Sequence, residues 1–209
     1  MAEAEKTIKL KKLGELSLRE YLGELAAPER KPRAASAAAV TGGLAASIGA
    51  LSLSLAGEAE AESLKDVAEE LRQLREYMLI EAEEVTRSHT PLTRRLKEER
   101  ATADEIESAA RVACGIPNEL VYIMCRLLEM LDKIADVCRD EDVPELIAAA
   151  HMSLAVIASM RAEIRALSKY MSDETFRYTV NREAELNVQE HQALTDALLN
   201  KLHARLEAN

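Results

Sequence analysis

One stretch of this chain constrains its fold more than any other: residues 34 to 57 contain no charged side chain. They read AASAAAVTGGLAASIGALSLSLAG, with almost nothing larger than leucine. Small residues recur at helical spacing along one side, at Ala35, Ala39, Gly43 and Ser47. A helix with such a side lets neighbouring backbones approach closely. At about 1.5 Å per residue it would be roughly 36 Å long, so we expect it to cross the centre of a domain.

The same stretch raises the question of a membrane, since a run of more than about 18 uncharged residues can form a transmembrane helix. Small residues at every fourth position are also a packing device in lipid. However, alanine, serine and glycine dominate the stretch, and few leucine, isoleucine or valine residues favour its transfer into hydrocarbon. No aromatic belt flanks it, and strongly charged segments follow it. We therefore favour a buried helix of a soluble bundle and expect no membrane partner.

The composition indicates an all-α protein. Its 209 residues include one phenylalanine, five tyrosines and no tryptophan, and 48% of them are hydrophobic, so the core must be aliphatic. Such a composition favours helices over sheets. A formal net charge of -10 leaves no basic face for phosphates, and we expect no nucleic acid partner. Three cysteines fit a reducing compartment, and the N-terminus shows no secretory signal, so we expect a cytoplasmic protein.

Helix start and stop signals divide the chain into three parts. Residues 1–16 resemble an N-terminal arm. Residues 17–171 form the predicted bundle of five to six helices around the small-residue helix, and residues 172–209 a C-terminal helical extension that packs on it. Capping boxes begin helices at Ser17 and Thr102, and Asp142 is a candidate N-cap. Pro91 and Pro117 should end or kink their helices, and a kink at Pro117 would border a pocket.

Histidines and cysteines give little sign of chemistry. None of the four histidines stands three residues after a glutamate, so the ligand pairs of di-iron bundles are missing. Cys114, Cys125 and Cys138 are too far apart for a paired-cysteine zinc motif and are best interpreted as small buried hydrophobes. His151 lies in the apolar run AAAHMSLA and is more typical of a core histidine than of a catalyst. We therefore expect no metal site.

Carboxylates and two arginines are the remaining candidates. Glu81, Glu83 and Glu84 follow the apolar run YMLI. One of them on the inner side of its helix would have a raised pKa, useful for a general base, although a solvated face is the commoner outcome for each. Arg161 and Arg165 lie one turn apart in an otherwise apolar helix. Their guanidinium groups need anions, which are either carboxylates of the bundle or a ligand.

Four segments in the right order and spacing resemble the cyclodeaminase/cyclohydrolase family. This family comprises the cyclodeaminase domain of formiminotransferase-cyclodeaminase and the bacterial methenyltetrahydrofolate cyclohydrolases. Its members typically read SLREFL, then PxPGGGSAAAL, then an Ala/Gly-rich helix, then an Asp-Ala-Glu-Ala segment and a VPL-x-V kink. The matching segments here are SLREYLGELA from residue 17, PRAASAAAV from residue 32, IEAEEV at residues 80–85 and GIPNELV at residues 115–121.

The resemblance implies a helical homodimer that binds a tetrahydrofolate derivative. Such a protein expels ammonia from the formimino adduct or hydrolyses the methenyl ring, without a cofactor beyond this substrate. By position, Glu81 takes the place of the family's catalytic aspartate, and Ser36 matches the serine after its glycines. Arg33 replaces the first of these glycines, and Arg161 and Arg165 replace two asparagines of the family.

Two hypotheses of different class follow from these substitutions. In the first, the protein acts on a one-carbon folate or another anionic small molecule, with Glu81 as acid/base. Arg33, Ser36, the N-terminus of the small-residue helix and the Arg161/Arg165 pair then form a positive binding pocket. In the second, the protein is a catalytically inactive homodimer that serves as a binding or scaffolding subunit, and the two arginines neutralise glutamates. For either dimer, the strongly apolar segment 116–137 is the predicted isologous interface.

Overall fold

The computed structural model describes residues 13–27 and 34–208, and it is all-α, as the composition predicted; the described residues contain no strand. Short 3-10 turns lie at Leu13–Glu15 and Asp140–Asp142. The helices are α1 (Leu18–Ala26), α2 (Ala34–Ser54), α3 (Glu58–Ser63), α4 (Lys65–Arg95), α5 (Ala103–Ala135), α6 (Val143–Ser168) and α7 (Glu174–Ala208).

Two of the three predicted helix starts have the expected geometry. Ser17 and Thr102 each accept a hydrogen bond from the backbone three residues later, and the glutamate at that position bonds back to the cap, which completes both capping boxes. Asp142 is the N-cap residue of α6, as predicted, but it does not cap the helix through its side chain. Its side chain makes no capping bond and accepts one from the Arg139 guanidinium at 2.7 Å instead. A strong cation three residues earlier thus outcompetes the backbone N–H groups.

Both internal prolines lie within continuous helices. Pro91 is inside α4 and Pro117 inside α5, so neither ends its helix. A pocket of about 190 Å³ does lie beside the second proline, between α5 and α7, where Cys114 and Asn118 line it. The tertiary packing of long helices therefore overrides the local signal to stop.

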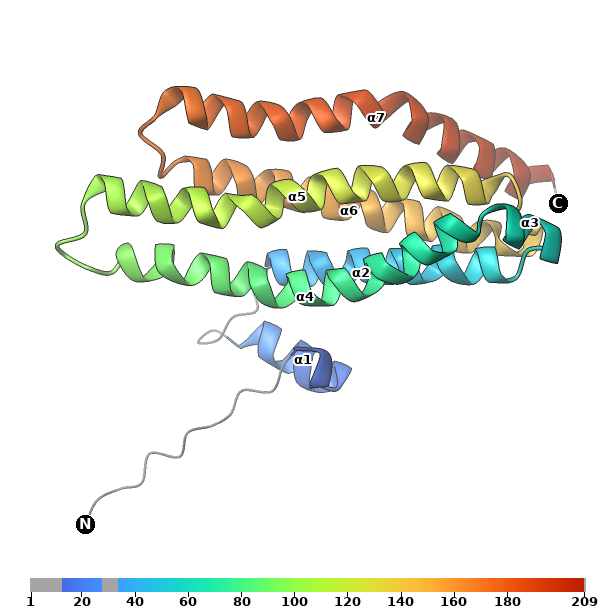
Figure 1. Ribbon diagram of the computed structural model, residues 1–209, viewed down its shortest axis with the longest axis horizontal. Helices are drawn as coiled ribbons and strands as arrows, with labels where there is room; N and C mark the ends of the chain where they lie inside the picture. The colour runs from blue at the N-terminus through green and yellow to red at the C-terminus, as the bar shows by residue number, and fades with distance from the viewer. Residues whose placement is uncertain (1–12, 28–33, 209) are drawn as a thin grey trace, which may run out of the picture.

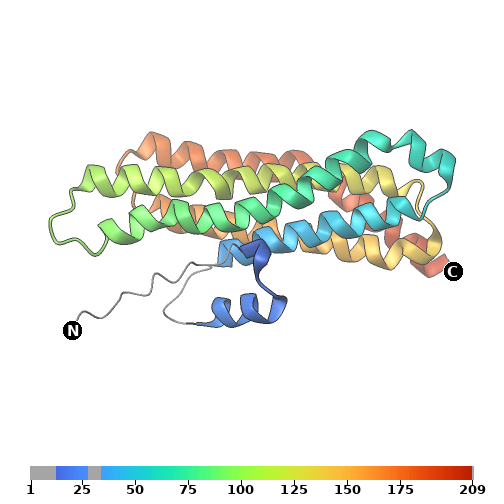
Figure 2. The same ribbon diagram turned by 60° about the horizontal axis from the view of Figure 1, so that its bottom comes forward.

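Four helices form an antiparallel bundle, and α7 lies along it (Figure 1). Helix α2 packs on α4 and α6, while α5 packs between α4 and α6 on the opposite side. Helix α7 packs on α5 and α6. Helix α1 lies outside the bundle, on the side of α2 (Figure 2). The small-residue stretch thus forms one of the four bundle helices, as a helix was predicted there, but the prediction that it lies at the centre with the others around it was wrong.

Glycines let α2 approach its neighbours closely. A Cβ atom on Gly42 would lie 3.1 Å from the Met124 side chain, and one on Gly49 would lie 2.9 Å from Leu131. Both glycines thus stand where larger side chains of α5 fill the core. Only about half of α2 is buried, however, so α2 covers one face of the bundle and is not enclosed on all sides.

Two helical segments, Ala34–Ser54 and Asp140–Ser168, are long and apolar enough to cross a membrane by length and composition alone. Each buries 44 to 50% of its apolar window against other helices of the bundle. Core helices of soluble proteins pass the same test, so these segments are weak grounds for a membrane location.

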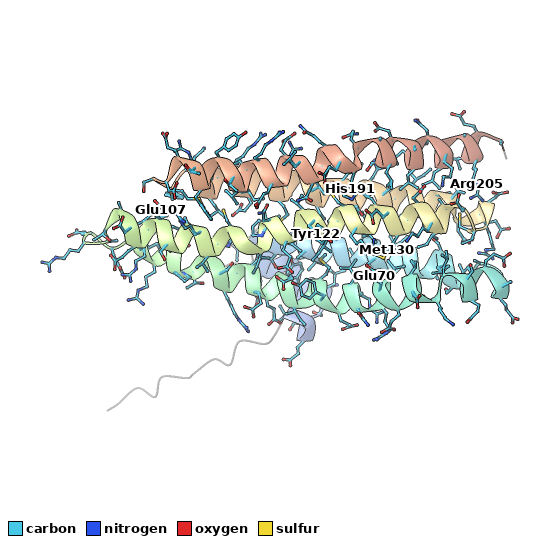
Figure 3. The ribbon with its side chains drawn as sticks, turned by 45° about the horizontal axis from the view of Figure 1, so that its top comes forward. Glu70, Glu107, Tyr122, Met130, His191 and Arg205 are labelled. Carbon is cyan, nitrogen blue, oxygen red and sulfur yellow. The ribbon has the colours of Figure 1, made fainter. Side chains whose placement is uncertain are left out.

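Polar contacts attach α7 along its whole length. Glu107 of α5 accepts hydrogen bonds from the backbone N–H groups of Ser172 and Asp173 just before α7 begins. His191 lies at 2.9 Å from Glu129 in the middle of the helix, and Arg205 donates to the Ala135 carbonyl at its far end. These three side chains are spread along the bundle in Figure 3. Helix α7 is therefore bonded to α5 and the turn after it near its start, middle and end.

Candidate active site

Glu81 is the one glutamate of its cluster that the fold buries. Its side chain is 7% exposed, whereas Glu83 and Glu84 are partly exposed and pair with Arg87. Among the described residues no group bonds to its Oε2 atom, which is buried. Burial is the main cause that raises the pKa of Glu81, and the nearby Tyr77 hydroxyl opposes this shift. Glu81 is therefore poised to hold a proton at a higher pH than an ordinary glutamate.

Tyr77 links Glu81 to α5. Its hydroxyl donates a hydrogen bond of 2.6 Å to Oε1 of Glu119 on α5. Burial, followed by the hydrogen bonds to Glu119 and Glu81, raises the pKa of Tyr77. Two carboxyl groups thus lie around one phenol that stays protonated. A charge on Glu119 also raises the pKa of Glu81.

The two arginines proposed for ligand binding contact α7. Arg161 forms an ion pair with Glu185, and Arg165 lies 4.0 Å from the same carboxylate. Arg161 is partly buried, whereas the Arg165 side chain is 69% exposed. A carboxylate of the chain itself therefore serves as their anion, which is the first of the two possibilities that the sequence left open.

Ser36 is fully buried near the start of α2. Its hydroxyl lies 3.5 Å from that of Tyr21, the only buried side chain of α1 among its described residues. Burial raises the pKa of Tyr21, so its hydroxyl stays neutral. Ser36 thus joins α1 to α2. Arg33 lies outside the described residues.

The candidate residues therefore fall into three places and not into one predicted pocket. Glu81 faces Tyr77 and α5, Arg161 and Arg165 face α7, and Ser36 faces α1. The first of these places has the features of an acid/base site. The other two are contacts between helices of the same chain.

A buried pair that the sequence did not reveal crosses the bundle between α4 and α6. His89 is 0% exposed, its Nδ1 atom lies 2.6 Å from the Val85 carbonyl, and its Nε2 atom lies 2.8 Å from Oε1 of Glu163. Both ring nitrogens thus face oxygen acceptors.

This pair lies beyond the start of α2. Met78 packs at the level of Gly42. His89 is eleven residues further along α4, whereas α2 begins only eight residues before Gly42, and the two helices run in opposite directions. Figure 1 shows α4 and α6 extending past the first turn of α2. The burial of His89 could have been predicted from its position in the helical repeat, because it follows Met78 and Val85 on the buried side of α4.

The remaining histidine and cysteine predictions have mixed outcomes. His151 is exposed, so its interpretation as a core histidine was wrong: α6 is apolar on its outward side too, and an apolar neighbourhood in sequence did not mean burial. The three cysteines are free and buried, as predicted. Burial raises the pKa of Cys114 to about 12, so its thiol stays protonated. Over residues 13–27 and 34–208 no cluster of three or more histidine, cysteine or acidic side chains could hold a metal ion.

The fold and the site together define the class of the protein. It is an antiparallel all-α bundle with a buried carboxyl group between α4 and α5. The model of the formiminotransferase-cyclodeaminase family matches residues 17–186, so the chain belongs to this family. The sequence resemblance is thereby confirmed.

A solved structure has the same fold. It is the crystal structure of formiminotetrahydrofolate cyclodeaminase from Thermotoga maritima, which superposes with a TM-score of 0.81 at 20% identity. The match covers 93% of this chain and 98% of the other. The search against curated proteins returned no match.

Proposed function

We propose that this protein acts on a one-carbon tetrahydrofolate, in its formimino or methenyl form, or on a related anionic small molecule. Membership of the formiminotransferase-cyclodeaminase family supports this substrate class. The likeness of fold to a formiminotetrahydrofolate cyclodeaminase agrees with it. The proposal needs no cofactor beyond the folate substrate, and it places the protein in the cytoplasm, where such substrates would be available.

The burial of Glu81 is the observation that carries the proposal. It stands in the segment that resembles the family's Asp-Ala-Glu-Ala motif, and it is the only one of the three neighbouring glutamates that is buried. A carboxyl group with a raised pKa is a better proton donor near neutral pH than a solvated glutamate. Tyr77 is the positioning residue, because its hydroxyl lies between Glu81 and Glu119.

The chemistry assigned to Glu81 is proton transfer. In a cyclodeaminase reaction the secondary amine next to the pterin bonds to the formimino carbon and gives up its proton, and the bond from that carbon to the imino nitrogen breaks. The imino nitrogen needs two protons to leave as ammonia: one comes from the attacking amine, and protonated Glu81 would donate the other. In hydrolysis of the methenyl ring, ionised Glu81 would instead take a proton from the attacking water.

The test uses the purified protein with methenyltetrahydrofolate and with formiminotetrahydrofolate. With methenyltetrahydrofolate as substrate, its absorbance should fall as the ring is hydrolysed. With formiminotetrahydrofolate as substrate, the absorbance of the methenyl product should rise and ammonia should be released. Glu81→Gln should lose both activities by at least about 100-fold, which is typical of a removed general acid or base. Glu76→Gln, an exposed position on the same helix, removes the same charge and should keep them. Turnover by the wild type no faster than buffer would overturn the enzymatic proposal.

Stability separates loss of chemistry from loss of fold. Burial raises the pKa of Glu81 in the folded state, so its ionisation opposes folding as pH rises through that pKa. Glu81→Gln should therefore be at least as stable as the wild type at pH 8, and the difference should shrink as the pH falls. A less stable variant at pH 8 would show that Glu81 makes a stabilising contact in its charged form.

The pairing of Arg161 and Arg165 with Glu185 favours a second candidate function. If the arginines only neutralise this glutamate, the chain is a catalytically inactive dimer that binds a partner or serves as a scaffold. A thermal-shift series with folates distinguishes the two candidates, because any ligand that binds the folded state raises its melting temperature. No shift with any folate, together with no turnover, would support the inactive dimer.

A further inference from the structure

A groove of about 470 Å³ lies beside α4, close to the start of the described chain. The 3-10 turn Leu13–Glu15 contacts α4 and forms one edge of the groove through Gly14 and Glu15. The lining residues on α4 follow the i, i+3, i+4, i+7 spacing of a single helix side. They are Glu76, Leu79, Ile80, Glu83, Glu84 and Arg87. One side of α4 and the turn before α1 therefore form the groove together.

Two large apolar side chains of the groove are open to water. Leu79 is 36% exposed and Ile80 is 57% exposed. They are neighbours in the sequence and line the same groove, so they form one apolar surface on α4. Covering this surface with another apolar segment would stabilise the folded protein by about 25 cal/mol for each Å² removed from water.

The groove is also acidic. Four of its eight lining residues are glutamates, and one is an arginine. Arg87 pairs with both Glu83 and Glu84, so one cation faces two carboxylates. Glu76 pairs with Arg75, which lies outside the lining, and acidic side chains still outnumber basic ones four to two when this arginine is included. Such a groove fits a segment that combines apolar with basic side chains.

The N-terminal arm contains a segment of this chemistry. Residues 6–12 read KTIKLKK, with four lysines and no acidic side chain. In an extended segment Ile8 and Leu10 would share one side, because successive side chains of an extended chain alternate. Residues 28–33, which also lie outside the described residues, read PERKPR and have no large aliphatic side chain to cover the apolar surface. Charge and apolar pattern together therefore favour residues 6–12 as the occupant.

The arm is also long enough and begins in the right place. From Glu76 to Arg87 the side of α4 that lines the groove rises by about 16 Å, at about 1.5 Å per residue. Seven residues of extended chain span up to about 23–25 Å. The arm joins the turn that forms one edge of the groove, so it can reach the apolar surface without crossing another helix.

We propose that residues 6–12 dock in this groove of their own chain. Ile8 and Leu10 then cover the apolar side chains of α4, and the lysines lie near its glutamates. Tyr21 is the only buried side chain among the described residues of α1, so the docked arm would give α1 a second attachment to the bundle. The proposal does not depend on the proposed catalysis.

The first test measures how fast trypsin cuts the arm. Trypsin cuts after lysine, and mass spectrometry of the remaining protein identifies cuts within residues 6–12. These cuts should be at least about tenfold slower in the wild type than in Leu79→Ser/Ile80→Ser, because cleavage follows the fraction of undocked arm. Val112→Ser is the matched control, since Val112 is 60% exposed on α5, and its arm should be cut as slowly as that of the wild type. Equal rates in the groove variant and the wild type would overturn the proposal.

A second test leaves the apolar side chains of α4 in place. The chain has no tryptophan, so Ile8→Trp introduces a single fluorescent reporter. Its emission should lie to the blue of that of Ala2→Trp, which is outside the docking segment. Adding Glu83→Lys/Glu84→Lys should remove this blue shift, because the groove would then repel the lysines of the arm.

Two outcomes of the fluorescence test would overturn the proposal. One is identical emission from Ile8→Trp and Ala2→Trp, which would mean that the arm leaves the groove open. The other is a blue shift that grows over a hundredfold range of protein concentration, because the arm would then bind another molecule. Docking within one chain should give the same blue shift at every concentration.

Discussion

Helices α2 and α7 lie on opposite parts of the same bundle and are held in different ways. Helix α2 has no charged side chain, and Ala39, Ala45 and Ala46 are fully buried against its neighbours. Helix α7 carries charged side chains along its length, and few of its residues are buried. Shape and close contact therefore position α2, whereas directional polar contacts position α7.

The polar contacts of α7 recur along the helix. Glu185 bonds to α6, His191 and Lys201 bond to acidic side chains of α5, and Arg205 bonds to Asp140 and to carbonyl groups at the end of α5. The family model ends at residue 186, so the last three of these contacts lie beyond it. We therefore expect substitutions that change side-chain volume to weaken the packing of α2 more than that of α7. Substitutions that change side-chain charge should weaken the attachment of α7 more than that of α2.

The largest effect is expected from overfilling the contact of α2 with α5. A Cβ atom on Gly49 would already lie 2.9 Å from Leu131, so Gly49→Leu must displace core side chains. We expect a loss of about 3 kcal/mol in the free energy of unfolding, measured with urea. Gly115→Leu is the control, since no atom lies within 4 Å of a Cβ atom there. Equal stability of Gly49→Leu and the wild type would show that α2 is loosely packed.

A smaller effect is expected when the polar clamp at the end of α7 is removed. Arg205 donates to the carbonyl group of Ala135, the last residue of α5, where intrahelical donors run out, and to that of Cys138 in the turn that follows. Arg205→Leu should lower the free energy of unfolding by about 1–2 kcal/mol and increase hydrogen exchange in the last turns of α7. Arg182→Leu, at an exposed position of the same helix, should change neither.

Low pH should weaken the attachment of the start of α7 to α5. It should leave the packing of α2 unchanged. Hydrogen bonds from Ser172 and Arg111 lower the pKa of Glu107 to about 2, from about 4.3 in an unfolded chain. A lowered pKa stabilises the folded state above the unfolded value, and this contribution is lost as pH falls toward 2. Protection of the backbone amides at the start of α7, measured as hydrogen exchange relative to the intrinsic rate at each pH, should therefore fall between pH 5 and pH 3. Glu107→Gln should remove this pH dependence, and a response unchanged by it would exclude Glu107 as the cause.

Local signals in the sequence were sufficient for the fold. The uncharged stretch predicted α2, and serine and threonine followed by glutamate predicted the starts of α1 and α5. These signals act over a few residues and need no knowledge of the neighbours. The exposed side of α2 could not be predicted, because a helix that is apolar all round gives no sign of which side faces water.

Long-range pairings were the part of the site that could not be predicted. Glu81 was a candidate from its apolar neighbours, yet its burial and that of Glu83 differ only through the packing of α4 on α5. The pair of His89 and Glu163 joins residues 74 positions apart across the bundle, so it depends on the register of two long helices. Charges that meet only in the folded state leave no pattern in either segment alone.

The smallest effect on stability is expected from salt. Salt should also distinguish α7 from α2 most clearly, because only α7 is held by charged side chains. Lys201 pairs with Asp132 and Asp136 at 2.7 and 2.9 Å, but all three side chains are at least 31% exposed. Pairs of this kind contribute about 0.2–1 kcal/mol and are screened by salt. Raising sodium chloride should therefore increase hydrogen exchange slightly in the second half of α7 and leave α2 unchanged, because α2 has no charge to screen. Lys201→Met should remove most of this response, and an equal response of α2 and α7 would contradict the distinction between packing and polar contacts.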